Sequence, residues 1–342
     1  MLRASGRRAV TRRRGILLGV NLLLGVAFLA FILRRFGAGA IESLATGFSP
    51  AWLTVFFGLA ATALGLLARR WQMLLEGIGE APPIARLAAL RAAGHGLGVL
   101  VPSARVGGDP LRVWLVLREG VSGRSALSSV AVDRILEMGA AAPFSIAFAL
   151  VLIQHEVPDL RSALAVLLVV TGTFALAVFS TARRLAGGKG IVTSFARRSG
   201  LAGLPWLRER MGLIADAEAS TGVLVRERAR LEKCFALGVA CNAVVLLEIT
   251  ALLHAFGLPS QPVAVVAALF AAATAQQLPV PAGVGLLEGA EIWIFQMLGH
   301  GAEVGLAVAF AMRLRDVVWA LPGLAALGLR ARAPDVPETD AV

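Results

Sequence analysis

Residues 100–112 read LVPSARVGGDPLR and residues 278–290 read LPVPAGVGLLEGA, and these two stretches decide the fold expected of the chain. Each interrupts an apolar region with prolines and glycines, which end helices and leave backbone N–H and C=O groups without helical partners. At membrane depth such groups are tolerated only where the backbone is buried in protein or lines a wet cavity. We therefore interpret the two stretches as the turns of two re-entrant or broken-helix hairpins, over 84–118 and 262–299.

The rest of the chain has the composition of a membrane domain. Of its 342 residues, 57% are hydrophobic and 16% are charged, whereas about a quarter of the residues in an average soluble domain are charged. Several apolar runs approach or exceed the ~20 residues that cross a ~30 Å hydrocarbon core. The sequence thus predicts an all-α, polytopic membrane helical bundle with about six full spans. These predicted spans are 15–33, 50–68, 125–153, 161–182, 234–256 and 303–329.

The distribution of basic residues predicts the topology. Six arginines lie in residues 1–14, and the loop 183–233 holds eleven Lys/Arg against five acids. Cytoplasmic flanks carry an excess of Lys/Arg, so we expect both segments in the cytoplasm. With the chain inside at Arg70 and again near Arg124, the first hairpin must enter and leave from the inside. By the same count the second hairpin begins and ends outside, so the two hairpins have opposite orientations.

Residues 15–332 are therefore expected to form one transmembrane domain, followed by a polar tail over 333–342. We expect this domain in the bacterial cytoplasmic (inner) membrane. The stretch 205–232 mixes apolar and charged residues at helical spacing, which suits either a helix on the membrane surface or a solvated helix. The net charge of +11 is explained by topology and anionic lipid headgroups, so nucleic acid is not an expected partner.

The two hairpins also carry charges at matching positions. An acid follows Pro102 and Pro281 after seven residues in each case, giving Asp109 and Glu288. An arginine follows each acid after twenty-five residues, and a second acid follows each arginine after three, giving the sets Arg134 with Glu137 and Arg313 with Asp316. Together with the opposite orientations, this spacing indicates an inverted repeat around a central site, as in many transporters.

The intramembrane charges are expected to pair with one another. Arg134 lies roughly 14 Å and Arg313 roughly 15 Å into its predicted span, near the middle of the hydrocarbon core. An acid three residues later can pair with each arginine on one helical face. The predicted set of intramembrane charges is Asp133, Arg134, Glu137, Glu248, Arg313 and Asp316. The pairs could line a polar path or act only as clamps between helices, and Glu248 could face a cavity, couple to protons or neutralise an arginine.

The first hairpin turn has the chemistry of an anion site. Arg105 and Arg112 flank the Gly107–Gly108 pair and Asp109, so fork-shaped guanidinium donors accompany exposed backbone N–H groups, as a phosphate requires. The alternative is a charged turn that merely reaches the cytoplasmic interface. The complete predicted substrate-binding set is Arg105, Gly107, Gly108, Asp109, Arg112, Pro281, Gly283, Gly285 and Glu288.

Other chemistry is not indicated. The four histidines and the pair Cys234 and Cys241 have no metal-ligand spacing, so no metal and no cofactor is expected. Gly187, Gly188 and Lys189 lack the rest of a phosphate-binding loop, which argues against an ATP-driven pump. No nucleophile stands beside a base, so we expect no enzyme.

RVGGDPLRVWLV at 105–116 and LPVPAGVGLLEG at 278–289 resemble the family of lysylphosphatidylglycerol synthase transmembrane-region, or flippase-like, proteins. The resemblance implies a domain associated with lipid translocation, which in some members precedes a synthetase domain; that domain is not expected here. Partners would be membrane lipids with anionic or polyprenyl-linked headgroups and a separate lipid-modifying enzyme. The predicted function is translocation of a polar or phosphate-bearing lipid, with a headgroup-modifying enzyme or a scaffold for lipid synthesis as alternatives.

Overall fold

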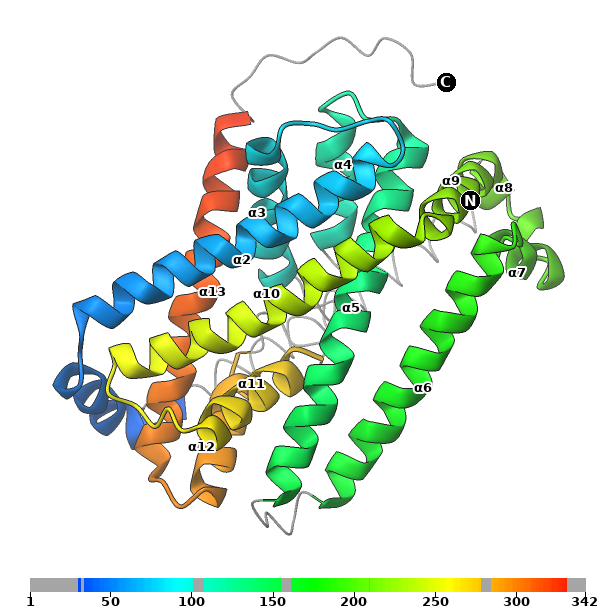
Figure 1. The fold of residues 1–342 in the computed structure, drawn as a ribbon. Helices are drawn as coiled ribbons and strands as arrows, with labels where there is room; N and C mark the ends of the chain where they lie inside the picture. Colours follow the sequence, from blue (N-terminus) through cyan, green and yellow to red (C-terminus); the bar gives the residue numbers. More distant parts are fainter. Residues whose placement is uncertain are drawn as a thin grey trace, which may run out of the picture.

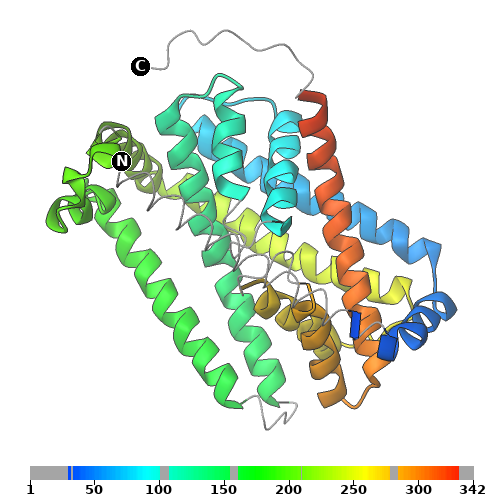
Figure 2. The same cartoon turned by 180° about the vertical axis from the view of Figure 1, so that it is seen from behind.

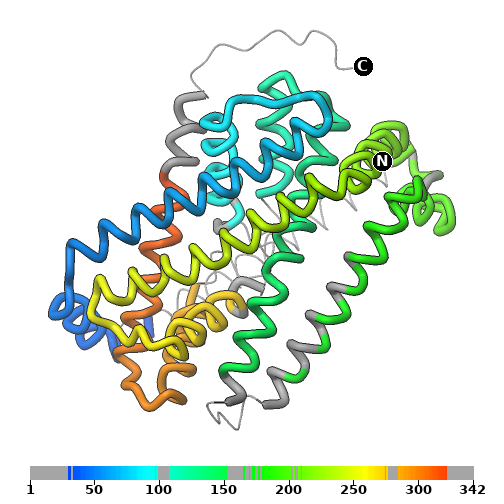
Figure 3. Tube along the Cα trace, viewed as in Figure 1, coloured from blue at the N-terminus to red at the C-terminus, as the bar shows by residue number. Residues whose placement is uncertain are grey.

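The computed structural model describes residues 30–31, 34–100, 108–154, 161–208, 210–277 and 284–330, which Figure 1 draws as a coloured ribbon; Figure 3 gives the trace of the chain in the same view. Within these ranges the regular elements are helices, and no strand occurs. The all-α prediction is therefore confirmed. The predicted basic N-terminus 1–14, most of the predicted span 15–33 and the tail 333–342 lie outside the described residues.

Two sets of four helices have the same order and nearly the same lengths. The first repeat consists of α2 (Pro50–Glu76), α3 (Ile84–Leu100), α4 (Gly108–Leu117) and α5 (Gly123–Gln154), with 27, 17, 10 and 32 residues. The second repeat consists of α10 (Arg228–Ala255), α11 (Pro262–Gln277), α12 (Leu286–Met297) and α13 (Ala302–Arg330), with 28, 16, 12 and 29 residues. The two hairpins expected from the sequence fall on α3–α4 and α11–α12, and their predicted turns lie largely in 101–107 and 278–283, outside the described residues.

Corresponding helices of the two repeats run in opposite directions. The backbone N–H of Ser49, before α2, donates to the carbonyl of Ala255 at the end of α10 (2.7 Å), and Arg230, near the start of α10, donates to the carbonyl of Met73 (3.0 Å). α2 and α10 therefore lie antiparallel, and Figure 1 shows the same reversal between α5 and α13. This arrangement agrees with the inverted repeat expected from the charge spacing.

Five described elements connect the repeats: α6 (Arg161–Ala186), α7 (Val192–Arg198), the 3-10 turn Leu201–Gly203, α8 (Pro205–Arg208) and α9 (Met211–Arg226). Glu218 of α9 accepts hydrogen bonds from the N–H groups of Ile191 and Val192, both at 2.6 Å, and so holds the start of α7. The predicted loop 183–233 is thus largely helical. Whether its second half lies on a membrane stays a prediction.

Three described helices are long and apolar enough to cross a membrane: Pro50–Glu76, Gly123–Val151 and Arg228–Ala255. They coincide with the predicted spans 50–68, 125–153 and 234–256. The number of six full spans stays a prediction.

Small residues let the hairpin helices approach their neighbours closely. A Cβ atom on Gly108, at the start of α4, would overlap the carbonyl of Gly94 in α3. A Cβ atom on Gly305 of α13 would lie 2.6 Å from Cα of Ile292 and 2.7 Å from the carbonyl oxygen of Glu291, both in α12. Glycine is required at both crossings, because small residues allow helix backbones to touch. Figure 2 shows α13 running beside α3, so the repeats also contact each other.

Candidate functional site

A carboxylate on α5 stands at the centre of the first repeat. Asp133 is fully buried and accepts hydrogen bonds from Nε of Arg70 and Nη2 of Arg112, both at 2.7 Å, and from Nη1 of Arg91. These arginines come from α2, α4 and α3, so one side chain joins all four helices of the repeat. We call Arg70, Arg91, Arg112 and Asp133 the Asp133 cluster. Buried charges with several partners are the arrangement that a low-dielectric interior requires.

The position of Arg70 corrects an expectation from the sequence. Arg70 was expected beyond the end of a span over 50–68, as a cytoplasmic flank. Instead α2 continues to Glu76, and Arg70 is 1% exposed. The neighbouring Arg69 is exposed and pairs with Glu76 at 2.6 Å. Asp133 supplies the counter-charge for the buried Arg70, and hydropathy along the sequence does not register this partner on another helix.

The remaining charges of the first repeat are more exposed. Asp109 accepts a hydrogen bond from Nε of Arg134 at 2.9 Å and lies 3.3 Å from Arg112. The predicted pair between Arg134 and Glu137 is present at 3.4 Å, and Glu137 also accepts from Arg91 at 2.8 Å. The side chains of Asp109 and Glu137 are 19% and 38% exposed. Exposure therefore rises from the buried Asp133 outward to these two acids.

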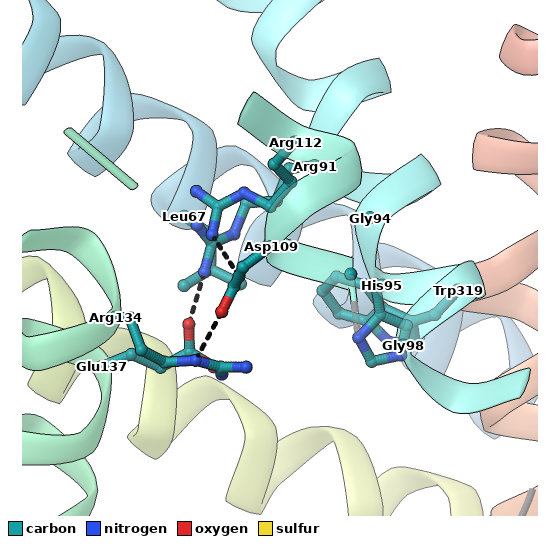
Figure 4. Close-up of a pocket in the computed structure, with 11 residues that line it drawn as sticks. Leu67, Arg91, Gly94, His95, Gly98, Asp109, Arg112, Arg134, Glu137 and Trp319 are labelled. Carbon is teal, nitrogen blue, oxygen red and sulfur yellow. Dashed lines mark hydrogen bonds and ion pairs between the residues drawn. The ribbon is translucent and has the colours of Figure 1, made fainter. Parts of the chain in front are cut away.

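A cavity of about 70 Å³ lies at this outer edge. In Figure 4, Asp109 stands between Arg91 and Arg112 on one side and Arg134 and Glu137 on the other, whereas His95 and Trp319 close another side. Trp319 belongs to α13, so the second repeat contributes to the cavity wall. Buried water needs only about 10–15 Å³ by the same measure, so the cavity has room for a small polar group but not for acyl chains.

One donor in this wall is unused. Nε of Arg112 is buried and has no hydrogen-bond partner, although Nη1 and Nη2 of the same side chain face Asp109 and Asp133. The guanidinium also lies 4.4 Å from the centroid of the Trp71 ring, as a cation–π contact. A buried donor without a partner is costly, so a bound water or ligand oxygen near it would be stabilised.

The second repeat has a matching ion pair. Nε of Arg313 donates to Glu288 at 2.9 Å across twenty-five residues, which repeats the bond from Arg134 to Asp109 in the first repeat. The expected partner of Arg313 was Asp316, three residues along its own helix; the structure instead directs Arg313 to α12. Glu288 sits in the first turn of α12 and also accepts from the N–H of Gly285 at 2.8 Å, so this carboxylate is fixed by two groups.

Glu248 neutralises an arginine, which is one of the roles left open by the sequence. Its carboxylate accepts from Nε of Arg315 at 2.9 Å and from Nε1 of Trp319 at 3.0 Å. The ring of Trp319 lies 5.3 Å, centroid to centroid, from that of His95. A chain of contacts therefore joins the cavity to Glu248 in the second repeat.

The structure brings together much of the predicted set, with exceptions. Gly108, Asp109, Arg112, Arg134 and Glu137 line the cavity, and Asp133 lies beneath it. Glu288, Gly285 and Arg313 form the separate pair in the second repeat. Arg105, Gly107, Pro281 and Gly283 lie outside the described residues.

Four interior charges were absent from the predicted set: Arg70, Arg91, Glu291 and Arg315. Arg91 is the charge that a search for partners of Asp133 would have indicated, because it interrupts the apolar run 87–100. Glu291 and Arg315 follow predicted residues by three and two positions. Among the described residues, no three His, Cys, Asp or Glu side chains gather in a metal-binding group.

The fold and the charged interior define a helical integral membrane protein built from an inverted pair of four-helix repeats. The sequence matches the family described as the lysylphosphatidylglycerol synthase TM region over residues 16–323, and the chain belongs to that family. The resemblance noted in the two hairpin motifs is thereby confirmed.

Two curated relatives come from Methanothermobacter thermautotrophicus, and both are described as UPF0104 membrane proteins. One is 28% identical over 322 residues, which cover 90% of each chain. The other is 22% identical over 314 residues, which cover 86% of this chain and 90% of the relative. These relatives support an integral membrane location and carry no description of a substrate.

Proposed function

We propose that this protein moves a polar-headed lipid between the two leaflets of a membrane, and that the cavity at α3, α4 and α5 receives a phosphate of the headgroup. The observation that carries the proposal is the cavity wall, where Arg91, Arg112 and Arg134 meet and where Nε of Arg112 lacks a partner. Guanidiniums are the side chains best suited to phosphate oxygens.

The charge balance favours an anionic group. Four guanidiniums of the first repeat stand with three carboxylates, Asp109, Asp133 and Glu137, so the group carries one net positive charge. A phosphate oxygen would compete with Asp109 for Arg112 and Arg134, because these contacts lie nearer to the exterior than those of Asp133. Binding of a phosphate in place of Asp109 would thus leave the hydrogen bonds of the buried Asp133 intact.

The size of the cavity implies that the headgroup and the acyl chains of the lipid take different paths. A headgroup phosphate can enter, while the acyl chains stay in the surrounding hydrocarbon, which avoids drawing them through a polar path. We further propose a multi-pass protein of the cytoplasmic (inner) membrane with its N-terminus in the cytoplasm, as the arginines of 1–14 favour.

The test is lipid translocation in proteoliposomes that contain phosphatidylglycerol with a fluorescent acyl chain. An impermeant quencher added outside reports the label that remains in the inner leaflet. Arg134→Gln should slow translocation about tenfold, equivalent to about 1.4 kcal/mol, because a cavity-lining guanidinium is lost. Arg69→Gln is the matched control, since it removes the same charge from an exposed pair.

Equal rates for the two variants and the wild type would refute the assignment of the cavity. A parallel assay with a labelled glycolipid that has no phosphate separates phosphate recognition from general headgroup transport. Conversion of the labelled lipid to a new species would instead support the alternative of a membrane enzyme.

A further inference from the structure

Glu291 of α12 is a buried carboxyl that the proposed transport path does not use. The residue is 0% exposed, and both of its carboxyl oxygens are buried without a hydrogen-bond partner. The other acids inside the two repeats at comparable burial, Asp133, Glu248 and Glu288, each face at least one guanidinium. Glu291 therefore differs from them in having no counter-charge within the described part of the chain.

The described basic side chains on the elements packed against α12 are bonded to other acids or are exposed. α11 contains no acidic or basic residue. On α13, Arg313 bonds to Glu288 and Arg315 bonds to Glu248. Three further charges belong to the helix over 34–46, which supplies hydrophobic residues to the same core; all three are exposed: Arg34, Arg35 and Glu42. The remaining acids of α13 are Glu303, near its start, and the buried Asp316.

The nearest charge along α12 opposes ionisation. Glu288 lies one turn before Glu291 on the same helical face, and carboxylates at this spacing repel each other. The close crossing at Gly305 brings the α13 backbone onto the backbone of Glu291 and Ile292. This contact leaves little space for water, and an ionised carboxylate in such a place would lack both solvent and partner.

The repeat relates Glu291 to a residue of opposite charge. Aligning Asp109 with Glu288 places Glu291 at the position of Arg112. In the first repeat Arg112 bonds to Asp109 and Asp133. In the second repeat the same position holds an acid, so it cannot balance Glu288. The carboxyl group of Glu291 makes no hydrogen bond within the described residues. What this group can still do at its buried position is bind and release a proton.

We propose that Glu291 is a proton-binding site, protonated in the conformation described here, and that its deprotonation in another conformation couples lipid movement to a proton gradient. The coupling, but not the proton binding, rests on the proposed function. A proton suits the site better than a metal cation, because hard cations need about six oxygen ligands and the described residues offer no metal-binding group here.

Proton binding is tested by infrared spectroscopy of the reconstituted full chain at pH 7, since a protonated carboxyl absorbs at a higher frequency than a carboxylate. The expected result is a protonated-carboxyl band in the wild type that Glu291→Gln removes. Glu42→Gln, an exposed acid, is the matched control and should keep the band. A spectrum of E291Q identical to that of the wild type would overturn the inference.

Coupling is tested with the labelled phosphatidylglycerol described above, in vesicles with a gradient of one pH unit. If one proton moves with each lipid, this tenfold proton ratio can drive the lipid ratio between leaflets by up to tenfold, equivalent to about 1.4 kcal/mol. The wild type and E42Q should develop this asymmetry, whereas E291Q should translocate lipid without it. Asymmetry in E291Q equal to that of the wild type would overturn the coupling.

Two further readouts keep the outcomes separate. Glu291→Asp retains a carboxyl group and should show both the infrared band and the lipid asymmetry. It therefore replaces E291Q as the informative variant if E291Q does not fold. Absence of the band in folded E291D would count against the site. If the wild type moves no lipid under any condition, the proposed function fails, and the infrared result still decides whether Glu291 holds a proton.

Discussion

Replacing Asp133 by asparagine should destabilise the first repeat more than any other single substitution of an acid in it. The amide keeps the size of the side chain but removes the negative charge that faces Arg70, Arg91 and Arg112. The interior group of four guanidiniums and three carboxylates would change from one net positive charge to two, and the lost charge is the fully buried one. Glu137 is the acid left beside Arg70 and Arg91.

The structure sets the size of the effect. Removing one partner of a buried ion pair costs about 3–5 kcal/mol, and Asp133 has three partners. An ordinary hydrogen bond between membrane helices contributes about 0.6 kcal/mol. The loss of a buried counter-charge is therefore expected to cost several times as much as the loss of one hydrogen bond. We expect Asp133→Asn to lower the free energy of unfolding by at least about 3 kcal/mol.

The assay is unfolding of the purified protein from mixed micelles with increasing dodecyl sulfate, followed by tryptophan fluorescence. Trp71 lies against Arg112 and should report the loss of the Asp133 cluster. Arg70→Met alone should also destabilise, because it leaves Asp133 with one counter-charge fewer. The double variant D133N/R70M should be more stable than the sum of the single effects predicts, by about 1–3 kcal/mol.

Arg69→Met is the control for α2, because this guanidinium is exposed and its pair with Glu76 contributes at most about 1 kcal/mol. A cost below about 1 kcal/mol for D133N, or strictly additive effects in the double variant, would refute the view that Asp133 balances three buried guanidiniums.

Two further predictions concern the second repeat and the topology. Glu288→Arg and Arg313→Glu should each reduce the yield of folded protein, measured by size-exclusion chromatography in detergent. The double exchange should restore the yield, because the ion pair at 2.9 Å is re-formed with its charges reversed. A double variant with no better yield than either single variant would argue against a specific pair. Cys234 and Cys241 are buried, so a cysteine placed at exposed Ser199 or Gln261 can be labelled selectively with an impermeant maleimide. We expect Q261C to react in intact cells and S199C to react only after permeabilisation. Equal labelling of both variants in intact cells would contradict a single crossing of the membrane by α10.

The charge spacing predicted the repeat better than it predicted the pairs. The twenty-five residues between acid and arginine are the distance between true partners in both repeats. The spacing of three residues also allows a pair, and the sequence favoured it for Arg313. The separation of two residues in the sequence shows whether they share a helical face. It does not show how closely α12 approaches α13, which depends on Gly305 and on the packing between the two helices.

The buried arginines show a second limit of the sequence. Arg70 follows an apolar run and sits beside Arg69, so the two resemble a cytoplasmic flank. The structure separates them, because one faces Asp133 and the other faces the exterior. Arg91 was missed for the same reason: its role depends on a carboxylate forty-two residues away. Hydropathy alone cannot assign an inner or outer position to a charge whose partner is on another helix.

The repeats reverse charge at two equivalent places, Arg70 with Glu248 and Arg112 with Glu291, and their interiors differ in net charge. Arg70 in α2 and Glu248 in α10 each lie twenty residues after the start of their helix, and each pairs with the fourth helix of its own repeat. The interior of the first repeat holds four guanidiniums and three carboxylates, whereas that of the second holds two guanidiniums and four carboxyl groups. The field between them would orient a zwitterion, with its phosphate toward the first repeat and its ammonium toward the second. Under the proposed function, a zwitterionic headgroup that passed between the two halves would therefore keep a fixed orientation, imposed by the duplicated helices.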